Sequence, residues 1–89
     1  MKKEFMITTE TGIHARKATR LVGKANLFKS KITLRYNHTT IDLKSIMGMM
    51  SLGIGPGSSI VIEAIGPDEN DAMESLALLI REMNMEDER

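Results

Sequence analysis

Apolar side chains recur along the first part of the chain with two different periods, and each period predicts a kind of secondary structure. From Ala15 onward they return every three or four residues, which is the spacing of one face of an α-helix. These positions are Ala18, Leu21, Val22, Ala25 and Phe28. Between residues 31 and 36 apolar and polar side chains alternate, as on a strand with one buried face. We therefore predict a helix that ends near Leu27 and Phe28, followed by a strand.

The middle of the chain predicts a hairpin and a short helix. A strand at residues 39–43 follows the turn residues Asn37 and His38, and so short a connection requires antiparallel pairing. Ser45 then offers a hydroxyl before the apolar segment 46–52, as at a helix start. The glycine-rich run 53–57 ends that helix.

Two further strands and one helix complete the chain. We predict strands at residues 5–9 and 58–65, and a last helix from the acidic cluster 68–71 to about Met83, with residues 86–89 as a frayed tail. The last helix should bury Ala72, Leu76, Leu79, Ile80 and Met83. The resulting β-α-β-β-α-β-α order suits one domain over residues 1–89. We expect an α+β fold, an open-faced β-sandwich with a four-stranded antiparallel sheet and three helices on one face.

Composition excludes several classes of function. Lys and Arg together number 12, as do Asp and Glu, so the formal charge is zero and gives no general attraction to nucleic acid or an anionic membrane. Cysteine is absent, which excludes disulfides and thiolate metal sites. The first residues develop no apolar region typical of a signal peptide, so we expect none, and no apolar run reaches membrane-spanning length. We expect a cytoplasmic protein with no direct nucleic-acid contact and no membrane insertion.

His14 is the strongest candidate for chemistry, because it stands just before the first predicted helix. The first backbone N–H groups of a helix have no partner inside it, and with the helix dipole they attract anions. Arg16 adds a permanently charged, forked donor in the first turn. A helix N-terminus also disfavours an imidazolium, so we expect a neutral ring that can attack a phosphoryl donor. The alternative is a polar cap beside a surface arginine.

A second candidate is the apolar surface of the short helix, formed by Ile46, Met47, Met50 and Leu52. A helix of this length cannot bury every side of such a run, and exposed methionine adapts to several partners. The alternative is that these methionines fill gaps in the core. His38 is interpreted as a turn residue, because no second metal ligand is spaced with it. We expect no metal and no cofactor.

Two segments of the chain resemble the signature regions of a known family. Residues 12–16 with Ala18 and Thr19, and residues 43–48 with residues 50–53, look like those of HPr. HPr is the phosphocarrier of the bacterial phosphoenolpyruvate-dependent sugar phosphotransferase system. The resemblance covers nearly the whole chain and points to the Gram-positive type.

The resemblance implies a role for each matching residue. His14 would accept a phosphoryl group on Nδ1 from phospho-enzyme I and pass it to the A component of a sugar-specific enzyme II, while Arg16 holds the phosphate. Ser45 would be modified by HPr kinase/phosphorylase, and the modified form would act through the transcription regulator CcpA. The remaining residues form the implied partner-binding surface: Ile46, Met47, Met50, Leu52, Lys17, Thr19 and Arg20. Such a protein is a phosphoryl carrier rather than an enzyme, and we expect a monomer.

Lys17 departs from the family pattern, which has proline after the arginine. Proline is comfortable in the first turn of a helix, whereas a lysine brings a cation to the positive end of the dipole. We expect an exposed Lys17 that stabilises a phosphate on His14 by about 1 kcal/mol or less. The departure leaves an alternative function open, a regulatory binding module like Crh, which acts mainly through phosphoserine. Crh lacks the histidine that this chain retains.

Overall fold

The computed structural model describes residues 1–86, and its elements follow the predicted order. Three helices and four strands are found in these residues. The strands are β1 (Lys2–Ile7), β2 (Lys31–Tyr36), β3 (Thr39–Asp42) and β4 (Ser58–Ile65). The helices are α1 (Ala15–Ala25), α2 (Ile46–Met50) and α3 (Glu69–Glu86). The predicted α+β fold is confirmed.

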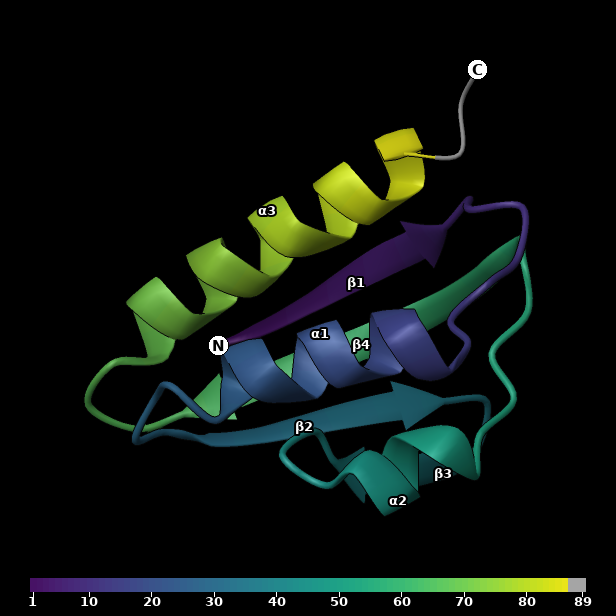
Figure 1. The fold of residues 1–89 in the computed structure, drawn as a ribbon. Helices are drawn as coiled ribbons and strands as arrows, with labels where there is room; N and C mark the ends of the chain where they lie inside the picture. The colour runs from purple at the N-terminus through teal and green to yellow at the C-terminus, as the bar shows by residue number, and fades with distance from the viewer. Residues whose placement is uncertain (87–89) are drawn as a thin grey trace.

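The four strands form one antiparallel sheet with the order β1-β4-β2-β3. β4 therefore lies between the first two strands of the sequence, pairing Glu63 with Lys2 on one side and with Thr33 on the other. α1 and α3 lie across the same face of the sheet, and α2 packs beside α1 near β3 (Figure 1). The helices and the sheet thus make two layers.

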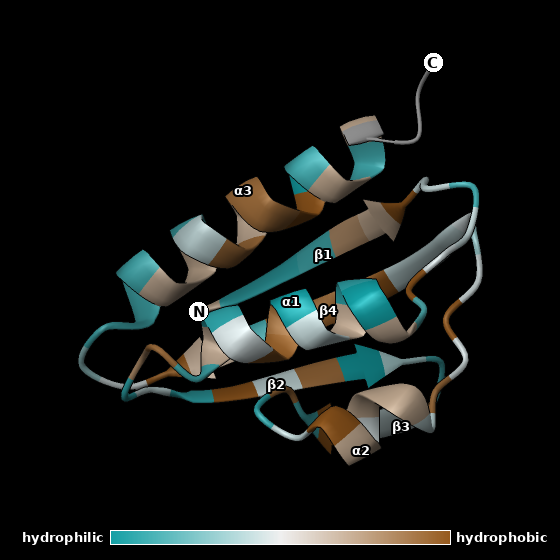
Figure 2. Cartoon of the chain, in the orientation of Figure 1, coloured by the Kyte–Doolittle hydropathy of each residue, from teal (hydrophilic) through white to brown (hydrophobic). Residues whose placement is uncertain are grey.

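The core fills the space between these layers. Alternate residues of the central strands face the helices and are buried: Ile60, Ile62 and Ala64 from β4, and Ile32 and Leu34 from β2. The predicted apolar positions of the last helix are all buried, as are Ala18, Leu21, Val22 and Ala25 of α1. Both helices consequently carry apolar and polar residues in alternation along their length (Figure 2).

Several predicted boundaries were wrong, each for a local reason. α1 ends at Ala25 rather than near Phe28, because Asn26 caps it and its side chain donates to the carbonyl oxygens of Val22 and Lys44. Phe28 is only half-buried against the core. β1 covers Lys2–Ile7 rather than 5–9, because its register follows β4.

The remaining boundaries differ by a few residues. β3 ends at Asp42, and α2 ends at Met50, where Ser51 caps it. α3 continues past Met83 to Glu86, so the predicted tail begins inside a helix and its last residues, 87–89, lie outside the described part of the chain. None of the helices within residues 1–86 combines the length and apolarity needed to cross a membrane.

Asp68 holds together two loops at the same edge of the molecule. Its carboxylate accepts hydrogen bonds from the backbone N–H of Lys29 at 2.8 Å and of Ser30 at 2.9 Å, and from the Ser30 hydroxyl. These bonds, led by that of the Ser30 hydroxyl, lower the pKa of Asp68 to about 2. The loop before α3 is thereby fixed to the loop before β2.

Asn84 connects the last helix to the edge strand β1. Its side-chain oxygen accepts from the backbone N–H of Thr8, and its side-chain nitrogen donates to the carbonyl oxygen of Met6, both at 3.0 Å. The carboxamide thus bonds the outer backbone of the strand in the way that a neighbouring strand would. The C-terminal end of α3 is tied to the segment that leads into His14.

Candidate functional site

The segment before His14 is a tight, fully bonded turn. The Thr9 hydroxyl, which is completely buried, donates to the carbonyl oxygen of Gly12 at 2.8 Å, and the Gly12 N–H donates back to Thr9 at 3.1 Å. Gly12 has φ of +65°, a conformation that glycine adopts without strain. The turn therefore delivers the chain to His14 in one fixed direction.

This turn also rests on the segment that follows α2. The N–H of Ile13 donates to the carbonyl oxygen of Ile54 at 2.9 Å. Thr9 and Ile54 were not predicted as site residues, because their partners are distant or depend on the turn geometry. The only signals in the sequence were Gly12 and the glycine-rich run 53–57. The predicted sites at His14 and Ser45 are therefore joined through the backbone that follows α2.

His14 occupies the N-cap position of α1. Its backbone is extended, with φ of −93° and ψ of −174°, and its carbonyl oxygen accepts the first helical hydrogen bond from Ala18 at 2.8 Å. The predicted N-cap position of His14, just before a helix that begins at Ala15, is confirmed, and the ring itself makes no capping hydrogen bond. The exposed ring is thus left at the helix N-terminus, where the first N–H groups have no partner in the helix.

The first turns of α1 present polar side chains beside His14. Arg16 and Thr19 are exposed, and Arg20 is half-buried. The Thr19 hydroxyl donates to the carbonyl oxygen of Ala15 at 2.8 Å. Arg16 stands two residues beyond His14 in the first turn, where a guanidinium can fork onto a phosphate bound at the helix end.

Lys17 does not lie where the sequence suggested. Its side chain is buried, with 5% exposure, and Nζ donates to the Thr11 hydroxyl oxygen at 3.0 Å. The expectation of an exposed lysine in the partner-binding surface is therefore wrong. The physical reason is that side chains in a helix lean toward its N-terminus, which directs Lys17 back over the preceding loop.

Ser45 forms the N-cap of α2, as predicted. Its backbone is extended, and its Oγ accepts from the N–H of Gly48 at 3.1 Å. The residue before it is anchored too, because the Lys44 ammonium donates to the carbonyl oxygen of Phe28 at 2.7 Å. The hydroxyl therefore sits at a fixed helix start.

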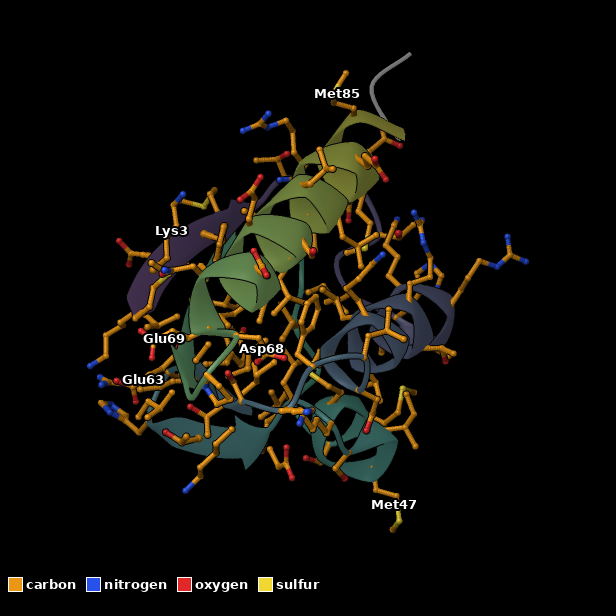
Figure 3. All side chains as sticks on the ribbon, turned by 90° about the vertical axis from the view of Figure 1, so that its left-hand side faces the viewer. Lys3, Met47, Glu63, Asp68, Glu69 and Met85 are labelled. Atoms are coloured by element: carbon orange, nitrogen blue, oxygen red, sulfur yellow. The ribbon has the colours of Figure 1, made fainter. Side chains whose placement is uncertain are left out.

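An apolar surface lies on α2 next to this serine. Met47 is 81% exposed, Met50 49% and Ile46 39%, and Figure 3 shows Met47 pointing away from the molecule. Leu52 is instead half-buried against the core, so it contributes less to this surface than predicted. Met49 is buried at 3% exposure and fills the core. The methionines of α2 thus divide between the two roles that the sequence left open.

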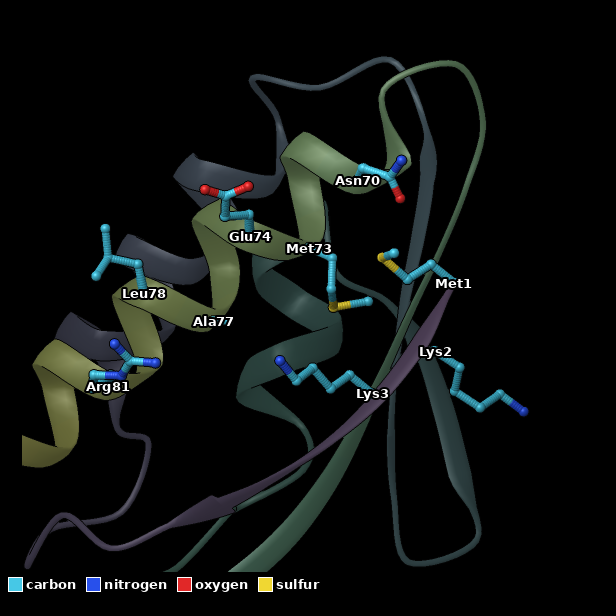
Figure 4. A pocket seen from close by; sticks show the side chains of 9 residues that line it. All are labelled: Met1, Lys2, Lys3, Asn70, Met73, Glu74, Ala77, Leu78 and Arg81. Carbon is cyan, nitrogen blue, oxygen red and sulfur yellow. The ribbon is translucent and has the colours of Figure 1, made fainter.

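A separate hollow of about 740 Å³ opens between β1 and α3 (Figure 4). Its walls include Lys3, Met73, Leu78 and Arg81, and none of the predicted site residues line it. Within residues 1–86, no group of three or more His, Cys, Asp and Glu side chains is placed to hold a metal ion. The candidate site residues His14, Arg16 and Ser45 and the exposed apolar residues of α2 therefore lie outside this hollow.

The chain is similar to known proteins over most of its length. A family model described as the PTS HPr component phosphorylation site matches residues 1–82. HPr-C-His from Thermoanaerobacter tengcongensis is 36% identical, with a TM-score of 0.90 and coverage of 94% of each chain. The histidine-containing phosphocarrier protein of Mycoplasma is 34% identical, with a TM-score of 0.91 and coverage of 94% of this chain and 96% of that one.

A regulatory relative has the same fold. Crh of Bacillus subtilis is 36% identical, with a TM-score of 0.73 and coverage of 90% of this chain and 92% of that one. Its crystal structure is a dimer with a swapped domain. The expected monomer therefore stays a prediction for the present chain.

Proposed function

Because this chain belongs to the HPr family of phosphocarriers of the phosphotransferase system, we propose that it carries a phosphoryl group on His14. The donor is phospho-enzyme I, and the acceptor is the A component of a sugar-specific enzyme II. The observation that supports this role best is the exposed His14 ring at the N-cap of α1, which makes no capping bond.

The proposed transfer uses the His14 ring as a nucleophile. A lone pair on Nδ1 attacks phosphorus, a new N–P bond forms, and the bond from phosphorus to the donor breaks with its electron pair remaining on the donor. The first backbone N–H groups of α1 and the Arg16 guanidinium stabilise the charge of the phosphate on His14. Passing the group to enzyme II reverses these events with a new acceptor.

Partner recognition is assigned to the apolar surface of Ile46, Met47 and Met50, with Leu52 at its base. Thr19 and the half-buried Arg20 lie on α1, which packs against α2. A carrier has to meet enzyme I and enzyme II in turn, and flexible methionine side chains repack between partners at small cost. Both partners would then cover His14 while they bind α2.

A second function is supported by Ser45 and by the likeness to Crh. HPr kinase/phosphorylase would phosphorylate the Ser45 hydroxyl, and the phosphorylated protein would bind CcpA, so that any contact with DNA is indirect. A phosphate there adds about −1.5 to −2 charges beside the apolar surface. In a purely regulatory protein, phosphoserine would signal and His14 would remain unmodified.

Labelling with enzyme I and radioactive phosphoenolpyruvate separates these functions. We expect acid-labile label on the wild type and on His38→Ala, which removes the other histidine, and none on His14→Ala. Thermal unfolding should be nearly the same for all three, because the His14 side chain is exposed. No label on the wild type, together with modification of Ser45 by the kinase, would favour the regulatory module instead.

A further inference from the structure

Lys17 is the one charged side chain that is buried among residues 1–85, whose side chains the structure describes. The other buried polar side chains of this part are those of Thr9 and Ser30, which are neutral. A buried ammonium loses its hydration and is retained only when it gains hydrogen bonds. The Thr11 hydroxyl supplies one of these bonds at 3.0 Å.

The position of this lysine makes it more than a packing residue. It lies in the first turn of α1, where the helix dipole disfavours a cation. An apolar side chain would fill the same space without that penalty. The buried ammonium group at the end of the helix that carries His14 therefore makes the fold less stable than an apolar side chain would.

The Lys17–Thr11 bond closes a small ring of chain around His14. Its two residues are six positions apart, and His14 stands in the middle, three residues from each. The loop side of the ring is already fixed, since Ile13 bonds to Ile54 and Gly12 bonds to Thr9. Lys17 connects that fixed loop to the first turn of α1, so the segments on both sides of His14 are held in place.

We propose that Lys17 is a positioning residue for phosphoryl transfer at His14. Its ammonium ties Thr11 to the first turn of α1 and so holds the His14 ring and the first backbone N–H groups of the helix in the geometry that accepts the phosphoryl group. This inference rests on the proposed function. The proline of the family pattern at this position would restrict the first turn covalently, whereas this chain has a hydrogen bond there that can be broken.

The first test measures how fast enzyme I phosphorylates His14 in variants that lack either end of the bond. Lys17→Met removes the ammonium and keeps a long apolar stem, and Thr11→Val removes the hydroxyl at an exposed position. Each substitution should lower the kcat with which enzyme I phosphorylates His14 by about tenfold, because a reacting group that loses its alignment reacts more slowly. KM should stay unchanged because the apolar surface of α2 is intact.

Two comparisons separate positioning from a general loss of structure. The double variant should be no slower than either single variant, because the bond is broken only once. Thr11→Ser, which keeps the hydroxyl, should restore the wild-type kcat. Lys24→Met, which removes a charge from the last turn of the same helix, should leave both kcat and KM unchanged.

The second test does not depend on phosphotransfer. Amide hydrogen exchange at Ile13 reports the loop directly, since that N–H bonds to Ile54. In Thr11→Val its exchange should accelerate about tenfold, while the amides of β4 keep their protection. Failure of enzyme I to label the wild type would refute the proposed function alone. The exchange measurement would still test whether the Lys17–Thr11 bond holds the loop before His14.

Two results would overturn the proposal. One is an unchanged kcat in Thr11→Val together with unchanged exchange at Ile13. The other is an exchange increase that is uniform over β4 and the loop, which would mean that Lys17 and Thr11 support only global stability. If Lys17→Met does not fold, Thr11→Val carries both tests, because it alters an exposed side chain.

Discussion

The carbonyl oxygen of Ile54 lies 2.4 Å from the place where a Cβ on Gly12 would stand. No real side chain tolerates such a contact with backbone, and Gly12 also has positive φ. The turn before His14 and the segment after α2 therefore approach this closely only because residue 12 is glycine.

Gly12→Ala should accordingly destabilise the protein by at least about 2 kcal/mol, from the left-handed backbone and the clash with Ile54. Urea unfolding measures this change. Gly23→Ala is the matched control, because a Cβ on Gly23 meets nothing within 4 Å in α1. It should stabilise the protein by about 0.5–1 kcal/mol. Equal effects of the two substitutions would contradict the close approach.

The hydrogen bonds of Asp68 should make the stability of the fold depend on pH. Its pKa falls from 3.8 to about 2 on folding, because Ser30 and Lys29 bond the charged carboxylate. A lowered pKa contributes stability above the unfolded value, and that contribution is lost as the pH falls from about 4 to 2. Asp68→Asn should lower stability at pH 7 and flatten this acid dependence. Asp71→Asn, at an exposed position in the first turn of α3, should keep the wild-type slope in thermal unfolding scans.

Ser45 predicts separate effects of its hydroxyl and of a charge. Ser45→Ala removes the bond to Gly48 and should cost about 1 kcal/mol of stability. Ser45→Asp keeps an acceptor at the cap, but its charge beside the apolar surface should slow the labelling of His14 by enzyme I. Asn70→Asp, which adds the same charge in the first turn of α3, is the control for labelling and should show the wild-type rate. Equal labelling rates for both aspartate variants would argue against a shared docking surface.

Two methionines of α2 should respond in opposite ways to the same substitution. Met47→Ala removes an 81% exposed side chain, so stability should change by less than about 0.5 kcal/mol while KM with enzyme I rises several-fold. Met49→Ala leaves a cavity in the core and should cost about 2–5 kcal/mol. Calorimetry and steady-state labelling on both variants check this pair. A KM unchanged in Met47→Ala would move the docking surface elsewhere.

The sequence predicted most of the architecture because local signals dominate it. The helical spacing from Ala18 to Ala25 and the alternation in residues 31–36 each predict which face of the element is buried. The short turn at Asn37 predicts the hairpin. The predicted boundaries of helices and strands were wrong where a bonding partner far along the chain sets them. Asn26 ends α1 through a bond to Lys44, and β1 takes its register from β4.

The candidate site was predictable only in part, for the same reason. His14 and Arg16 were predicted as site residues because a helix start gives each of them a chemical meaning that can be seen locally, whereas the role of Ser45 came from the resemblance to HPr. The direction of the Lys17 side chain could not be predicted, because its position in the helix is compatible with either an exposed or a buried side chain. Its partner Thr11 lies in a loop with no periodic pattern.

The pairing of β1 with β4 also sets the order in which the molecule can be built. Lys2 finds its partner at Glu63, and the N–H of Ile13 finds its acceptor at Ile54. A ribosome that has released only the first fifty residues has already made both His14 and Ser45, yet neither β1 nor the turn before His14 has a place to dock. Contacts of such long range slow folding. The growing chain therefore holds the His14 site in an unassembled form until the second half of the protein has emerged.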